Sequence, residues 1–137
     1  LVTLNGRNLS AFLSVDSQPG PNYGTLTLLT LPSSQSVESP SQIQNDIESD
    51  PQIVKQLTLL RGGNSRVVLG NLLTMPLGGQ MLYVEPIYTQ ATTGASFPIL
   101  RRIIAIYGTG KPAFSKNLST AMSQAIGVPL PTSHNQG

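Results

Sequence analysis

The stretch GNLLTMPLGGQMLYVEPIY, residues 70–88, is the most apolar part of the chain and decides between two folds. A membrane-spanning helix needs about 20 consecutive and mostly apolar residues. Here the apolar run is interrupted by Pro76 and Glu85, and its centre holds Gly78-Gly79. A glycine pair supplies the positive φ angles that a two-residue hairpin loop requires. The stretch is therefore predicted to fold back on itself as a β-hairpin.

Runs rich in β-branched, aromatic and leucine residues extend on both sides of this hairpin. Such runs are typical of strands, and an apolar residue at every second position strengthens the prediction. We expect strands at residues 9–16, 25–31, 65–75, 80–90 and 98–108, with a short run at 111–115.

Three stretches carry helix start signals. SPSQ (39–42) combines a capping serine, a proline at the first helical position and a glutamine that can bond back to the serine amide. Asp50-Pro51 repeats the signal before an apolar stripe at helical spacing, which Gly62-Gly63 ends. Asn117 caps a last predicted helix that stops at Gly127.

These elements predict an α+β fold. The expected core is an antiparallel or mixed sheet of about five strands, with two or three helices packed on one face. Because 137 residues suit one domain, we expect a single domain over residues 1–126 and a flexible tail over residues 127–137.

Composition excludes several kinds of chemistry. The net charge is +2 with scattered basic residues, which is too little for a nucleic-acid footprint. The absence of cysteine removes disulfides, thiolate metal sites and cysteine nucleophiles. Charged residues make up 10% of the chain, compared with about 25% in an average soluble domain, which favours a setting outside the cytoplasm. The chain begins with Leu1, from which we expect a fragment of a longer protein.

Glu85 is the carboxylate within the apolar stretch, and the following strand carries Arg101 and Arg102. Pro86 holds Glu85 in an extended conformation. Because successive strand residues point to opposite faces, one arginine can share the face of Glu85. We expect a cross-strand pair, which serves either as the polar centre of a ligand pocket or as a structural ion pair.

RGGNSR (61–66) places Arg61 and Arg66 around two glycines. Such a turn can present backbone amides and positive charge to an anion. The alternative is a helix C-cap joined to the next strand by the glycines that end the helix.

No stretch carries an enzyme motif, and the chain is predicted not to be an enzyme. YGTGKP (107–112) lacks the glycine and the hydroxyl residue of a phosphate-binding loop. NDIESD (45–50) lacks the glycine and the distal glutamate of a calcium loop. The one histidine, His134, lies near the end of the chain, away from any set of metal or triad partners. We therefore expect no metal and no cofactor.

Several long stretches resemble a known family. NYGTLTLLTLP (22–32), GNLLTMPLGGQMLYVEP (70–86) and LRRIIAIYG (100–108) are similar to the C-terminal portion of an uncharacterised family of large bacterial integral membrane proteins. The resemblance runs from Asn8 to Gly127. It implies that the chain is the soluble part of a membrane protein and lies outside the cytoplasm. The family has no established activity or catalytic residues to transfer.

Three functions remain open at this point. The first is a non-catalytic interaction or structural module that docks on the rest of its parent protein or on a neighbouring envelope protein. An uncovered apolar hairpin would also favour self-association into a homo-oligomer. The second is a binding module for an anionic small molecule or cell-envelope component, held by the arginines. The third is an enzyme, for which Glu85 is the best candidate residue.

Overall fold

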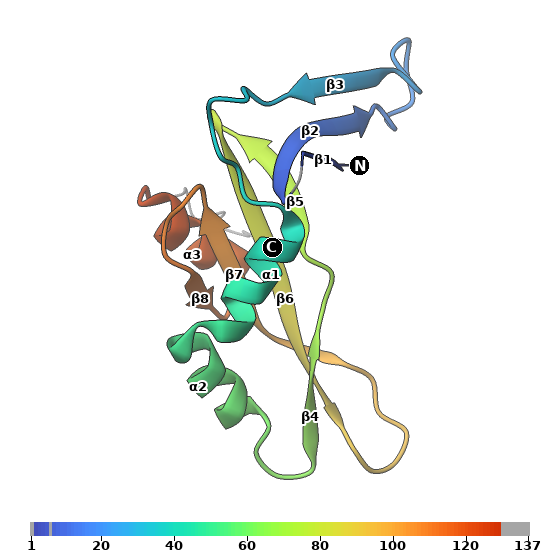
Figure 1. Ribbon diagram of the computed structural model, residues 1–137. Helices are drawn as coiled ribbons and strands as arrows, with labels where there is room; N and C mark the ends of the chain where they lie inside the picture. Colours follow the sequence, from blue (N-terminus) through green and yellow to red (C-terminus); the bar gives the residue numbers. More distant parts are fainter. Residues whose placement is uncertain (1, 6, 130–137) are drawn as a thin grey trace. The chain divides into compact units, whose positions relative to one another are not determined.

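The computed structural model describes residues 2–5 and 7–129 (Figure 1). The chain divides into two compact units, Leu1–Ile43 and Gln44–Gly137. The expected single domain over residues 1–126 stays a prediction. Most of the expected tail, including His134, lies outside the described residues.

The first unit is a three-stranded antiparallel sheet in the order β1-β2-β3. Its strands are β1 (Val2–Asn5), β2 (Asn8–Val15) and β3 (Leu26–Thr30). β1 was not predicted from the sequence. Leu9 and Ala11 of β2 are buried, whereas all five residues of β3 are exposed. β3 pairs with β2 along one edge only, so its other edge is free within the described sheet.

The predicted caps define the first two helices, α1 (Pro40–Ser49) and α2 (Pro51–Leu60). Ser39 N donates to Gln42 Oε1 at 2.8 Å, and Gln42 N donates to Ser39 Oγ at 3.4 Å, which confirms the capping box. Asp50 Oδ1 accepts from the amides of Gln52 and Ile53 at 2.8 and 3.0 Å. These caps satisfy amides that would otherwise lack a partner at the start of each helix.

The second unit contains a five-stranded antiparallel sheet, which confirms the α+β prediction. Its order is β4-β6-β7-β8, and β5 also pairs with β6. The strands are β4 (Ser65–Leu69), β5 (Leu73–Leu77), β6 (Gln80–Ala91), β7 (Ile99–Tyr107) and β8 (Ala113–Ser115).

The predicted hairpin is formed by β5 and β6. Leu77 is opposite Gln80, and Gly78 and Gly79 have φ angles of 56° and 82°. Both central residues of the loop thus need the left-handed conformation that glycine adopts without strain. None of the helices in the described residues combines the length and the apolar composition that a membrane crossing requires.

The expected strand over residues 65–75 is split into β4 and β5. Leu69 is opposite Ile87 and Leu73 is opposite Val84, so three intervening residues on one side face two on the other. The cause is Pro86, which has no N–H to donate to the neighbouring strand. Gly70 lies against it, and a Cβ at Gly70 would come within 2.5 Å of Pro86 Cγ.

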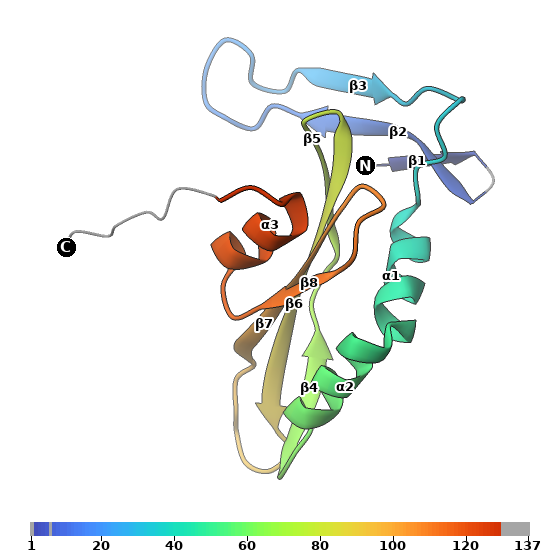
Figure 2. The same ribbon diagram turned by 90° about the vertical axis from the view of Figure 1, so that its left-hand side faces the viewer.

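Helices pack on both faces of this sheet, which differs from the expected single face (Figure 2). On one face, α3 (Leu118–Ile126) places Ala121 against a buried cluster of Leu82, Val84, Ile103 and Ala105. On the other face, Gln44 of α1 contacts Glu85, and α2 contacts β4. The central residues of β6 are accordingly buried whichever face they point to.

Candidate functional site

Glu85 lies at the centre of β6 with only 1% of its surface exposed. Its Oε1 accepts a hydrogen bond from Gln44 Nε2 at 3.2 Å. The same nitrogen donates to Glu48 Oε1 at 3.0 Å, so one amide of α1 joins a buried carboxylate to an exposed one. The second oxygen of the buried carboxylate, Oε2, has no hydrogen-bond partner among the residues that the structure describes.

This environment changes the acidity of Glu85. Burial raises the pKa of its carboxyl, the hydrogen bond from Gln44 opposes that shift, and the nearby charge of Glu48 adds to it. A buried carboxylate with an unpaired oxygen is costly, because the charged form loses its hydration. Glu85 therefore keeps its proton to higher pH than an exposed glutamate does.

The expected pair between Glu85 and an arginine is not formed. Arg101 Nε donates to the buried Thr89 Oγ1 at 2.9 Å. Arg102 donates to the carbonyl of Arg101 at 2.7 Å, and its guanidinium carbon lies 5.9 Å from the centroid of the Phe114 ring.

The register of β6 and β7 explains this difference. Glu85 is opposite Ile104, whereas Arg102 is opposite Ile87 beside an irregularity in the pairing. Residues that differ by two share a face, so Arg102 is on the face of Glu85, as expected. Its side chain, however, turns to Phe114 on β8, the neighbour of β7 that lies away from β6. A cation over an aromatic face is a favourable contact that replaces the ion pair.

The two arginines of RGGNSR are used separately. Arg66 donates from Nε and Nη2 to Gln90 Oε1 at 3.2 and 2.7 Å. Gln90 Nε2 in turn donates to the carbonyl of Ser96 at 2.8 Å, which ties the loop after β6 to β4. Arg61 is the C-cap residue of α2, and its amide donates to the carbonyl of Leu57 at 3.1 Å. The helix C-cap is therefore formed as the alternative predicted, and the anion site at this turn stays a prediction.

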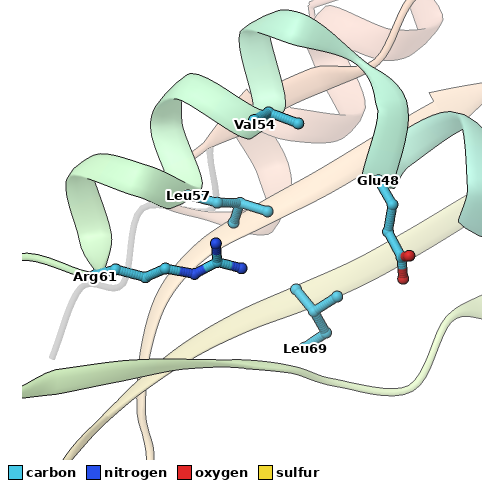
Figure 3. A pocket seen from close by; sticks show the side chains of 5 residues that line it. All are labelled: Glu48, Val54, Leu57, Arg61 and Leu69. Atoms are coloured by element: carbon cyan, nitrogen blue, oxygen red, sulfur yellow. The ribbon is translucent and has the colours of Figure 1, made fainter.

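The guanidinium of Arg61 points into a shallow depression of about 400 Å³ between α2 and β4 (Figure 3). Its floor is apolar and Glu48 lines it from α1; the lining residues are Glu48, Val54, Leu57, Arg61 and Leu69. One negative and one positive side chain thus share the lining of the depression.

A second depression, of about 440 Å³, has the same balance of charge. It is lined by Asp50 and Lys111 among apolar and amide side chains. The carboxylate of Asp50 is already used as the cap of α2. Neither depression thus presents the convergent donors that an anion site requires.

An apolar stripe on β5 is one of the exposed apolar features of the second unit. Leu73, Met75 and Leu77 are 53, 38 and 39% exposed and alternate along the strand, so they share one face. Leu73 and Met75 are opposite Val84 and Leu82, which are buried in the cluster beneath α3. The apolar face of the sheet therefore continues past α3 onto β5 and is uncovered there. We call these three side chains the β5 stripe.

Sequence reasoning found the stripe as part of an apolar hairpin that needs cover, but it missed the partner of Glu85. Gln44 and Glu48 are four residues apart on α1, a spacing that places two side chains together on one helix face. That spacing is the signal in the sequence that two polar side chains lie together on one face of α1. The residues that the structure describes contain no group of three or more His, Cys, Asp or Glu side chains that could hold a metal ion.

Comparison with known proteins identifies relatives along most of the chain. Residues 1–60 match the profile of an uncharacterised protein family, UPF0182. The chain is 44% identical over 128 residues to a UPF0182 protein of Streptomyces coelicolor, which covers 92% of this chain and 13% of that protein. It is 46% identical over 127 residues to one of Kineococcus radiotolerans, covering 87% of this chain and 12% of that protein.

A UPF0182 protein of Bifidobacterium longum is 40% identical over 126 residues, covering 87% of this chain and 12% of that protein. The chain thus spans about an eighth of the length of these curated relatives. No solved structure gives a significant match to the chain.

Proposed function

The chain belongs to the UPF0182 family, and on that premise we propose that it is a non-catalytic interaction module of a larger membrane protein, held outside the cytoplasm. Its partner in this proposal is another apolar segment of the same large protein. The relatives are about seven to eight times as long as the chain, so most of such a protein is available to supply that segment.

The β5 stripe is the observation that carries the proposal. It extends a packed core onto an exposed strand, and an apolar surface of this kind marks interaction sites. Burying the exposed part of each of the three side chains contributes about 1 kcal/mol apiece, on a scale of about 25 cal/mol per Å². The fold does not depend on the exposed part, so this free energy is available for docking.

The alternative, a binding module for an anionic small molecule, has less support. Arg66, Arg101 and Arg102 all donate to protein acceptors, and Arg61 shares its depression with Glu48. An anion placed beside Arg61 would meet that carboxylate, at a cost that offsets the attraction.

Docking can be tested by splitting the large protein. The tagged 137-residue chain is co-expressed with the remainder of the polypeptide, and co-purification is measured. We expect the chain to retain the remainder, and Leu73→Lys together with Met75→Lys to abolish retention. Leu59→Lys, at a 68% exposed leucine of α2 outside the stripe, is the matched control and should retain it. Equal retention by both variants would contradict the proposal.

The location needs a separate measurement. The chain has no cysteine, so a single Asn22→Cys change in the exposed loop before β3 introduces one label site in this segment. In a full-length family protein, a membrane-impermeant maleimide should label this site in intact cells as strongly as after lysis. Labelling that appears only after lysis would place the segment in the cytoplasm.

A further inference from the structure

The free edge of β3 has the properties of a strand-pairing site. β3 has the sequence LTLLT, and Leu26, Leu28 and Leu29 are 64, 59 and 42% exposed. The chain holds no Asp, Glu, Lys, Arg or His between Asp16 and Glu38. Folded proteins usually protect a free edge with charge, proline, a bulge or a short strand. β3 carries no charge or proline, and its pairing with β2 is regular over all five residues.

The pairing with β2 shows which backbone groups face the free edge. Asp16 N donates to Thr25 O at 3.0 Å, and Leu31 N donates to Ser10 O at 2.9 Å. In an antiparallel pair the hydrogen-bonding residues alternate along the strand. Thr27 and Leu29 therefore bond to β2. The N–H and carbonyl groups of the alternate residues point outward; these residues are Leu26, Leu28 and Thr30.

We propose that two copies of the chain associate through antiparallel pairing of β3 with β3, centred on Leu28. In this register Leu28 is opposite its counterpart in the second copy, and Leu26 is opposite Thr30. The outward groups of both strands then form about six backbone hydrogen bonds across one two-fold axis. Two three-stranded sheets become one continuous sheet of six strands.

The side chains of β3 suit a second copy. Leu26 and Leu28 are opposite Val15 and Leu13 of β2, so these four side chains share one face, and Val15 is 56% exposed. In the symmetric pair this apolar face continues across the two-fold axis into the same face of the second copy. Residues directly opposite each other across a two-fold axis are destabilising when they carry like charge. An uncharged strand avoids that penalty, which is why a second copy fits this edge.

β3 belongs to the first unit and the β5 stripe to the second, so dimerisation through β3 and docking through β5 can each fail alone. Sedimentation velocity of the 137-residue chain across a wide concentration range should show a monomer–dimer equilibrium. Leu28→Pro removes the outward N–H and places a ring at the two-fold axis, while every bond from β3 to β2 remains. It should raise the dimer Kd by more than about tenfold, because carbonyls are left without donors.

Leu28→Lys is a second variant in case the proline disturbs the strand. It keeps the N–H but brings two ammonium groups together at the axis, and it should also yield a monomer at low salt. Leu28→Thr is the matched control, because it keeps the N–H and the strand propensity and should still dimerise. Circular dichroism checks that each variant is folded. A wild-type chain that is monomeric at every concentration overturns the proposal. So does a dimer that survives in both Leu28→Pro and Leu28→Lys.

Discussion

The edge strands β3 and β5 are both rich in leucine, yet they present different chemistry to a partner. Leu77 and Gln80 flank a two-residue loop, and Met81 O accepts from Gly108 on the β7 side. The backbone of β5 at Leu73, Met75 and Leu77 therefore bonds to β6. Thr74 and Pro76 are left to face outward, and Pro76 has no N–H.

β5 thus offers apolar side chains but a poor backbone edge, whereas β3 offers three consecutive outward positions that can both donate and accept. Proline is tolerated at an edge because its missing N–H costs no bond within the sheet, and it hinders an added strand. The comparison shows that two functions of an edge strand are separable. A docking face needs exposed apolar side chains, while strand pairing needs outward backbone groups.

The largest effect is expected at Gly70, where the break that creates β5 begins. A Cβ there would lie 2.5 Å from Pro86 Cγ and 2.9 Å from Pro86 O. Since the backbone oxygen cannot move aside, Gly70→Ala should lower the free energy of unfolding by about 3 kcal/mol. Chemical denaturation measures this loss. Gly20→Ala is the matched control, with nothing within 4 Å of its Cβ, and should change stability little. Equal stability of the two variants would show that the break does not depend on this close approach.

The second prediction is that pH changes the stability of the second unit, which contains Glu85, but not association through β3 of the first unit. The pKa of Glu85 is raised above its ordinary value of 4.5 by burial. The stabilising contribution of the protonated form is therefore fully present below the pKa of the unfolded chain, and it is lost as pH rises through the folded pKa. Glu85→Gln should remove this loss, so the stability of the variant relative to wild type should increase with pH across that window.

Urea unfolding at a series of pH values measures the difference. Glu48→Gln is the control, since it removes only the nearby charge and should weaken the pH dependence without abolishing it. Parallel profiles for wild type and Glu85→Gln would contradict the assignment. Association through β3 should not change across the same range, because residues 17–37 carry no acidic, basic or histidine side chain.

Local signals in the sequence predicted the parts of the fold that local physics controls. Ser39, Asp50 and Asn117 each cap a helix as expected, because a cap requires only residues two or three positions away. The loop at Gly78-Gly79 follows in the same way from its positive φ angles.

Features that depend on distant residues were missed. The break before β5 requires Pro86 to meet Gly70 across the sheet, and the partner of Glu85 comes from Gln44, 41 residues away. The expectation of helices on one face was wrong although a signal existed. Met81 to Val84 form a continuous apolar run, which is typical of a strand buried on both faces.

The smallest change in stability is expected for Pro76→Thr. The same variant is the sharpest test of the difference between the edges of β3 and β5. Residue 76 is on the outer edge of β5, where its backbone groups bond to no other strand of the described sheet. The free energy of unfolding should therefore change by about 0.5 kcal/mol or less. The new N–H completes the outward edge at Thr74 and residue 76, and β5 then resembles β3. In a Leu28→Pro background, where association through β3 is blocked, Pro76→Thr should restore concentration-dependent association. Light scattering measures this gain, and Pro76→Ala, which also regains the N–H but has lower strand propensity, should restore it more weakly. If Leu28→Pro with Pro76→Thr stays monomeric, outward backbone groups do not decide whether these edges pair, and the difference between β3 and β5 lies in their side chains.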